Sequence, residues 1–147
     1  MKKIAIQGTK GSFHDIAAHQ FLEGEPIELI CCKTFEQVFE AIQQDATVMG
    51  LVAIAGSLLH NYELLRSSGV VVVGEHKLHI KHSICCLAAD DWNSIHEVHS
   101  HPVALAQCRK FLDLHSEFKA VVSEDTAGSA EEIALRDKHG WAAICSD

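Results

Sequence analysis

The sequence predicts an α/β protein with two βα lobes, each built on a mostly parallel sheet, around a cleft. Short apolar runs alternate with helical patterns along most of the 147 residues, which is typical of parallel strands covered by helices. One segment, residues 70–87, is rich in β-branched residues and contains no helical pattern. We therefore expect one lobe over about residues 1–73 and a second over about residues 74–147, with a small-molecule site between them.

The first half contains three strands, each followed by a helix. Strands are predicted at residues 3–6, 27–31 and 48–54, and helices at about residues 12–22, 34–44 and 57–67. Thr34, with Gln37 three residues later, forms a capping-box signal at the start of the second helix. Residues 51–54 are almost wholly apolar, as expected for a strand buried on both faces.

The second half resumes the same alternation after the long extended segment. Gly74 offers a bend within that segment. Strands are predicted around Val98 and at residues 118–122 and 141–145, and helices at about residues 102–114 and 126–138.

Composition and charge restrict the partners of the protein. The net charge of −8 at pH 7 leaves no basic patch for nucleic acid or an anionic membrane. It does not exclude an anionic small molecule, because backbone N–H groups at helix N-termini bind anions without lysine or arginine. No apolar run approaches the length of a membrane span, and the apolar stretch near Met1 is too short for a signal peptide. We expect a cytoplasmic protein that forms a homo-oligomer.

The cysteines and histidines do not favour a metal site. The six cysteines lie in or beside apolar runs without a Cys-x-x-Cys motif, which indicates buried, reduced thiols. In a strand, His79 points away from His76 and His82. His99 and His101 have no acidic or cysteine ligand close by in sequence. We therefore expect no bound metal and no cofactor.

Four turns that follow strands combine small and hydroxyl residues at a helix start. In Ser100-His101-Pro102 the proline suits the first helical position, so that Ser100 or His101 is the N-cap. Each turn alone is explained by ordinary helix capping, but the turns fall where α/β sheets bind their ligands. The other turns contain Gly11-Ser12, Gly56-Ser57 and Thr126-Ala127. Together they favour a cleft that holds a small anion.

Several segments, taken in order, resemble the prephenate dehydratase family. Ser100-His101-Pro102 through Gln107-Cys108 is similar to the family's Ser-His-Pro…Gln-Cys motif. The other similar segments are Gly8 to Ala18, Ala55-Gly56-Ser57 with Leu64-Leu65, Gly74-Glu75 with Leu78 to His82, and Thr126 to Ala130. The resemblance implies a fold like that of type II periplasmic solute-binding proteins, with two α/β lobes around the active site.

The resemblance also implies an activity. It is the decarboxylating dehydration of prephenate to phenylpyruvate, which needs no cofactor because loss of carbon dioxide and hydroxide produces an aromatic ring. Ser100 and Gln107 match active-site positions of the family. The substrate-binding positions implied are Gly11, Ser12, Gly56, Ser57, His101, Thr126 and Ala127. His14 and His101 are conceivable proton donors, although a polar surface or capping role is the more common one for such residues.

The sequence departs from the family pattern in two places. Ile54 leads directly to Ala55-Gly56, where the family has Glu-Asn-Ser/Thr-Ile before its glycine. We expect that residues exist between Ile54 and Ala55 in the protein and are omitted from this sequence, which would leave a spatial gap between the two. The chain ends at Asp147, before the family's Thr-Arg-Phe motif with its essential threonine, its return to the first lobe and any regulatory ACT domain. Two alternatives stay open: a non-catalytic module that binds a small anion or solute, and an arogenate dehydratase.

Overall fold

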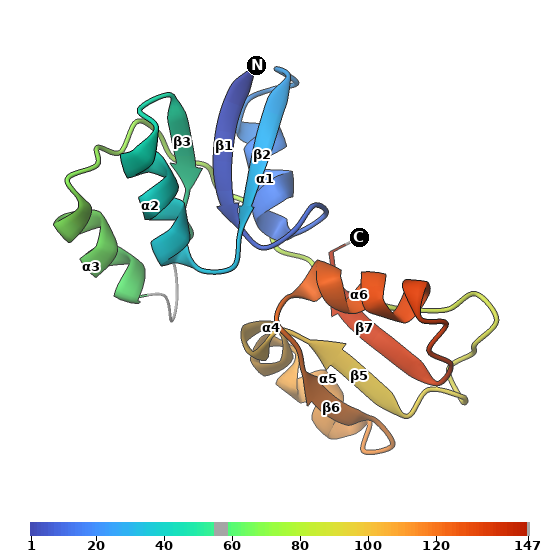
Figure 1. Ribbon diagram of the computed structural model, residues 1–147. Coiled ribbons are helices and arrows are strands. Elements are labelled where there is room, and N and C mark those ends of the chain that lie inside the picture. Colours follow the sequence, from blue (N-terminus) through green and yellow to red (C-terminus); the bar gives the residue numbers. More distant parts are fainter. Residues whose placement is uncertain (55–58, 147) are drawn as a thin grey trace. The chain divides into compact units, whose positions relative to one another are not determined.

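The computed structural model describes residues 1–54 and 59–146 and contains two compact units, Met1–His79 and Ile80–Asp147 (Figure 1). The division between them lies in residues 69–82, which have no regular secondary structure. The lobe boundary expected near residue 74 falls in the same segment. None of the helices within the described ranges combines the length and apolar character needed to cross a membrane.

The first unit has a three-stranded parallel sheet in the order β2-β1-β3. Its elements are β1 (Lys2–Gln7), α1 (Phe13–Phe21), β2 (Ile27–Cys32), α2 (Phe35–Gln44), β3 (Val48–Leu51) and α3 (Leu59–Ser68). Ile4 and Ile6 of β1 pack with residues of α1, whereas Ala5 packs with Val38 of α2. Because side chains alternate along a strand, α1 and α2 cover opposite faces of the sheet (Figure 1).

The strand predicted over residues 48–54 is shorter than expected, and the prediction that residues 51–54 are a strand segment buried on both faces is wrong. β3 ends at Leu51, where its pairing with Ile6 of β1 also ends. The side-chain amide of Asn61 donates to the carbonyl oxygen of Ala53 at 2.6 Å, and Ile54 is 44% exposed. Gln7, the last residue of β1, pairs with Cys32 of β2 and with no residue of β3. The chain leaves the sheet there, and the Asn61 side chain of α3 binds the carbonyl of Ala53.

The second unit has a four-stranded mixed sheet in the order β4-β7-β5-β6. Its elements are β4 (Ser83–Cys86), β5 (Glu97–Ser100), α4 (Pro102–Gln107), α5 (Arg109–Leu114), β6 (Lys119–Val122), α6 (Thr126–Leu135) and β7 (Trp141–Cys145). β5 is parallel to β6 and β7, and β4 is antiparallel to β7. The core under α4 and α5 is built around Val98, Leu105, Phe118 and Ile144.

The single helix predicted over residues 102–114 is two helices that meet at Cys108. The N–H group of Cys108 closes α4 by donating to Ala104 and Ala106. Leu105 of α4 and Phe111 of α5 both contact the same core. The interruption therefore divides the segment into two short helices that pack on the same core.

Gly140 offers a test of the packing before β7. Its φ of +76° is one that residues with a Cβ rarely adopt, and an added Cβ would lie 2.2 Å from Cε1 of His96 and 3.2 Å from the carbonyl oxygen of Ser94. Gly140→Ala is expected to lower the free energy of unfolding by about 2–3 kcal/mol, because backbone strain and overpacking add. Denaturant unfolding of the protein measures this.

Gly24→Ala is the matched control. Gly24 has a φ of +84° with no atom within 4 Å of an added Cβ, so only the backbone cost of about 1–2 kcal/mol applies. Equal losses for the two variants would contradict the close contact between Gly140 and His96.

Candidate active site

The carboxyl ends of the parallel strands meet at one edge of the second sheet. Ser100, the last residue of β5, pairs with Val122 at the end of β6, and His99 pairs with Ala143 of β7. The antiparallel β4 begins at the same edge, because Ser83 lies opposite Cys145. Ligands of α/β sheets bind at this edge. We call the polar residues in and beside the turns at this edge the strand-end cluster: His82, Ser100, His101, Gln107 and Thr126.

Ser100 ties the strands of this edge together. Its side chain is fully buried, and its hydroxyl donates a 2.6 Å hydrogen bond to the carbonyl oxygen of Ile144 in β7. The N–H group of Ser123, which follows β6, donates to the carbonyl oxygen of Ser100 at 2.9 Å. The geometry therefore favours a positioning role for Ser100 and does not make it the cap of α4.

His101 is the N-cap of α4, which decides between the two residues that the sequence left open. Its Nδ1 accepts a 3.2 Å hydrogen bond from the N–H group of Val103, and Pro102 occupies the first helical position. A nitrogen that accepts carries no proton, so the neutral ring holds its proton on Nε2. That N–H group can donate a hydrogen bond.

Gln107, at the end of α4, is held by a histidine. Nε2 of His82 donates to Oε1 of Gln107 at 2.7 Å, since an amide oxygen only accepts. This bond orients the exposed amide of Gln107 and leaves its NH₂ group as the donor side. Sequence reasoning did not assign His82 to the site. The sequence feature that could have identified His82 is its position at the end of the segment Leu78 to His82, which resembles the family's Gly-Glu…Ile…His segment.

Thr126 and Ala127 are the first two residues of α6, whose N-cap is Asp125. The carboxylate of Asp125 accepts a hydrogen bond from the N–H group of Gly128. The Ser129 hydroxyl donates to the Asp125 carbonyl oxygen at 2.6 Å and also bonds the Ser123 hydroxyl. The positive N-terminal end of the α6 dipole is thus already paired with the negative charge of the Asp125 carboxylate. The hydroxyl of Thr126 is the group that this turn can add to a substrate site.

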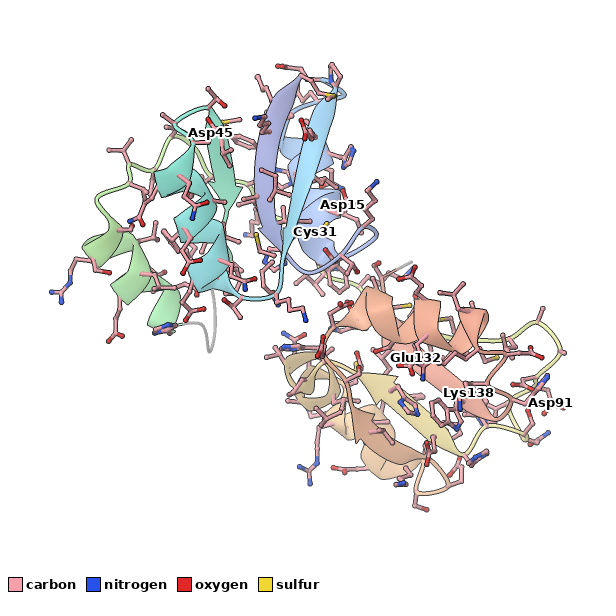
Figure 2. All side chains as sticks on the ribbon, viewed as in Figure 1. Asp15, Cys31, Asp45, Asp91, Glu132 and Lys138 are labelled. Carbon is pink, nitrogen blue, oxygen red and sulfur yellow. The ribbon has the colours of Figure 1, made fainter. Side chains whose placement is uncertain are left out.

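The turn after β1 has the same feature in the first unit. Ser12 is the N-cap of α1, and its hydroxyl accepts from the N–H group of Asp15 at 3.4 Å. The Asp15 carboxylate (Figure 2) accepts from the N–H group of Gly11 at 2.7 Å and pairs with Nδ1 of His19 at 2.8 Å. Gly11 and Ser12 are therefore engaged in capping, and substrate binding by them stays a prediction.

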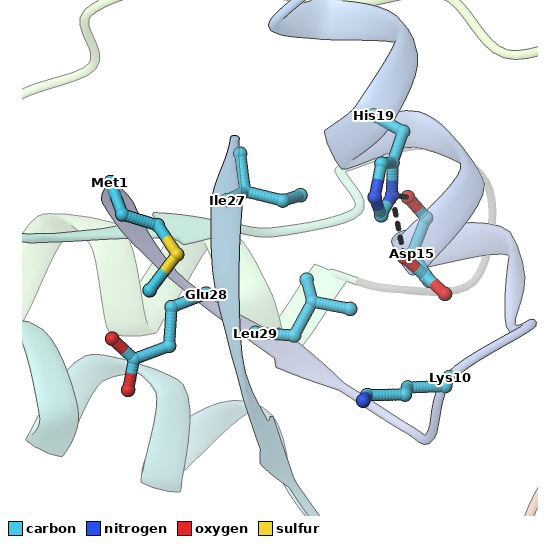
Figure 3. Close-up of a pocket in the computed structure, with 7 residues that line it drawn as sticks. All are labelled: Met1, Lys10, Asp15, His19, Ile27, Glu28 and Leu29. Atoms are coloured by element: carbon cyan, nitrogen blue, oxygen red, sulfur yellow. Dashed lines mark hydrogen bonds and ion pairs between the residues drawn. The ribbon is translucent and has the colours of Figure 1, made fainter. Parts of the chain in front are cut away.

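A surface pocket of about 430 Å³ lies beside this turn (Figure 3). It is lined by Met1, Lys10, Asp15, His19, Ile27, Glu28 and Leu29. The lining contains one lysine, Lys10, and two carboxylates, Asp15 and Glu28, so its charge does not suit a dicarboxylate. No residue predicted to bind substrate is among those seven.

His14 is a weak candidate for a proton donor. Burial lowers the pKa of its imidazole, which a backbone hydrogen bond with Gln7 only partly offsets. Its ring packs edge-on against Phe35, with 5.4 Å between ring centroids. The ring is therefore largely neutral at neutral pH.

Gly56, Ser57 and the join between Ile54 and Ala55 lie outside the described residues. On the following helix, Asn61 is 1% exposed and anchors Ala53 through the hydrogen bond described above. Across residues 1–54 and 59–146, no three His, Cys, Asp or Glu side chains are grouped so that they could hold a metal ion.

Comparison with known proteins gives a family match over nearly the whole chain. The family model described as "Prephenate dehydratase" matches residues 4–147. Arogenate dehydratase/prephenate dehydratase 2, chloroplastic, from Arabidopsis thaliana is 32% identical over 99% of this chain and 38% of its own length. The bifunctional chorismate mutase/prephenate dehydratase of Escherichia coli K12 is 29% identical over 99% of this chain and 39% of its own length.

A solved structure shows the same fold. The prephenate dehydratase of Staphylococcus aureus subsp. aureus Mu50 matches with a TM-score of 0.79 at 23% identity, over 99% of this chain and 55% of that one. The α/β class with mostly parallel sheets, predicted from the sequence as periplasmic-binding-protein-like, is thus confirmed. The chain spans about two fifths of the curated relatives and about half of the solved structure.

Ser100→Ala tests the tie between β5 and β7. The variant removes the hydroxyl that donates to the carbonyl oxygen of Ile144. The free energy of unfolding is therefore expected to fall by about 1–3 kcal/mol. Ser67→Ala is the control, because the exposed Ser67 hydroxyl also donates to a backbone carbonyl, that of Glu63 at 2.8 Å. Its expected change is within about 0.5 kcal/mol, and equal effects of the two variants would argue against a structural role for the Ser100 hydroxyl.

His14 gives a prediction on pH. A histidine whose pKa is lowered by folding reduces stability as the pH falls below about 6.5, because the unfolded chain binds the proton more readily. His14→Phe should therefore weaken the loss of thermal stability on acidification. His60→Phe should strengthen that loss, because the hydrogen bond to Glu36 raises the pKa of His60. A ring of His14 that titrates at or above 6.5 by NMR contradicts the burial argument.

Proposed function

This chain belongs to the prephenate dehydratase family, and from that premise we propose that the protein containing it converts prephenate to phenylpyruvate as a carbon–oxygen lyase. The strand-end cluster carries the proposal. It places the Ser-His-Pro turn, the His82–Gln107 pair and the start of α6 at one edge of one sheet.

The proposed reaction breaks two bonds. The ring carboxylate leaves as carbon dioxide, the electrons of its C–C bond complete the aromatic ring, and the C–O bond breaks to release hydroxide, which takes a proton to become water. The protein has to orient the dicarboxylate and assist the leaving hydroxyl. Both tasks are within reach of neutral hydrogen-bond donors.

We assign these tasks to three residues of the cluster. The NH₂ group of Gln107, oriented by His82, binds a substrate carboxylate. The Nε2–H group of His101, which the cap at Nδ1 makes the donor, is directed to a substrate oxygen. Thr126 at the start of α6 adds a hydroxyl. Ser100 acts by holding β5 and β7 in place.

Arogenate is the second candidate substrate. It carries an amino group where prephenate has its keto oxygen, and the relatives include proteins named for arogenate as well as for prephenate. The donors assigned above would bind the carboxylates and the ring hydroxyl, which both substrates share, so they do not choose between the two. A cytoplasmic location and a homo-oligomeric state stay predictions.

The full-length protein is expected to form phenylpyruvate from prephenate at an unchanged rate in the presence of a metal chelator. Phenylpyruvate is measured by its ultraviolet absorbance in alkali. Arogenate is the parallel substrate, and its product, phenylalanine, is measured by chromatography. If calorimetry shows that prephenate binds but neither substrate yields a product, the solute-binding module is supported and the proposal is contradicted.

Gln107→Leu tests the assigned amide. It is expected to lower kcat/KM by roughly tenfold to a hundredfold, since it removes a hydrogen bond to a charged group. Gln43→Leu is the control, because Gln43 of α2 also has an amide engaged on the surface, donating to the carbonyl oxygen of Ser68 at 3.1 Å. Equal kcat/KM values for the two variants would remove Gln107 from the site.

A further inference from the structure

Two cysteines of the second sheet have thiols in contact across neighbouring strands. Sγ of Cys85 on β4 lies 3.3 Å from Sγ of Cys145 on β7. Cys85 is opposite Ala143, and Cys145 is opposite Ser83. Residues two apart in a strand share a face, so Cys85 and Cys145 are diagonal neighbours on one face of the sheet.

The two thiols differ in environment. Cys145 is buried at 7% exposure, whereas Cys85 is partly exposed. The hydrogen bond from Cys145 is the main cause that lowers the pKa of Cys85 to about 7, although burial opposes it. Thiolates are the nucleophilic form of cysteine. Cys85 is therefore the thiol that reacts first with an oxidant from solution.

We propose that Cys85 and Cys145 are a redox site, in which a hydroperoxide converts the two thiols to a reversible disulfide. The Cys85 thiolate attacks one peroxide oxygen, the O–O bond breaks, and hydroxide or alkoxide leaves, giving the Cys85 sulfenic acid. The Cys145 thiol then attacks this sulfur, the S–O bond breaks, and water leaves as the S–S bond forms. The peroxide gains the two electrons that the two sulfur atoms lose.

The sulfur separation allows a bond to form, and the strand positions make that bond easy to reduce. A disulfide has an S–S distance of about 2.05 Å, so the sulfur atoms, 3.3 Å apart, need to approach by little more than one ångström. Diagonal strand positions have Cα atoms about 7–8 Å apart, beyond the usual disulfide range of about 4.4–6.8 Å, so the backbones of β4 and β7 have to move closer together as the bond forms. The strain of that movement makes the disulfide easier to reduce.

Oxidation also reaches the strand-end cluster. Cys145 follows Ile144, whose carbonyl oxygen accepts the hydroxyl of Ser100. A disulfide that pulls β7 toward β4 alters this hydrogen bond. A change in catalytic activity that results from the altered hydrogen bond rests on the proposed function. Formation of the disulfide does not.

The test is treatment of the reduced full-length protein with a small excess of hydrogen peroxide. Intact mass spectrometry is expected to show loss of two hydrogen atoms, and peptide mapping without reductant is expected to link Cys85 to Cys145. Dithiothreitol should restore the original mass. A stable link between other cysteines, or addition of oxygen without a link, overturns the proposal.

Cys86 is the matched control, because it is the exposed neighbour of Cys85 and burial raises the pKa of its thiol, reinforced by Asp90. Cys86→Ser should oxidise like the parent. Cys145→Ala should form no link. Because it also removes the hydrogen bond that lowers the pKa of Cys85, its Cys85 sulfenic acid, trapped with dimedone, should form more slowly than the disulfide forms in the parent.

Alkylation rates in the unmodified protein keep the test independent of folding by the variants. At pH 7, Cys85 should be alkylated roughly tenfold faster than Cys86, since the thiolate fraction sets the rate. Equal alkylation rates, or faster alkylation of Cys86, contradict the assignment of Cys85 as the thiol that reacts first with the oxidant.

Discussion

The candidate site depends on the parallel pairing of β5 with β6 and β7. This pairing places the carboxyl ends of three strands at one edge, where the turns that follow them supply polar groups. The hydrogen bond from the buried Ser100 hydroxyl to Ile144 reinforces it at the edge itself. A buried donor that lost this acceptor would bear its full desolvation cost. The register at this edge is therefore specified by a polar contact as well as by the core.

The helix termini beside the expected turns are not electrically alike. At α1 and α6, the carboxylates of Asp15 and Asp125 already bind backbone N–H groups. Such a carboxylate offsets the positive end of the helix dipole and weakens attraction for an anion. At α4 the cap is the imidazole of His101, which accepts through Nδ1 without bringing a negative charge in its neutral form. Among the three, the turn at His101 is the one most compatible with an anionic substrate.

Sequence patterns predicted the strands and helices well, but they did not reveal how elements end. Ser12 and Thr34 are caps as predicted, because capping is a local property. β3 stops at Leu51 instead of continuing through residue 54, and the carbonyl of Ala53 is bound by Asn61 of the following helix and not by a strand. The interruption at Cys108 follows the shape of a core formed by distant segments. Neither constraint is visible in a local pattern.

The same distinction applies to the site. Ser100, His101 and Gln107 were identified from a contiguous motif, whereas His82 reaches Gln107 from a segment 25 positions away in the chain. Contacts between distant segments need the pairing of β4 with β7, which no spacing in the sequence predicts. The cysteine pair depends on the same pairing, since Cys85 and Cys145 are 60 positions apart.

β7 shows how one strand serves several purposes through its alternation. Ala142 and Ile144 contribute to the apolar core under α4 and α5. Ala143 and Cys145 face the other way, where the thiol of Cys85 lies. The backbone carbonyl of Ile144, in contrast, points along the sheet and accepts from Ser100. Core, thiol and site contacts thus use three different directions of one strand, and the carbonyl that binds Ser100 belongs to the peptide unit that joins Ile144 to Cys145.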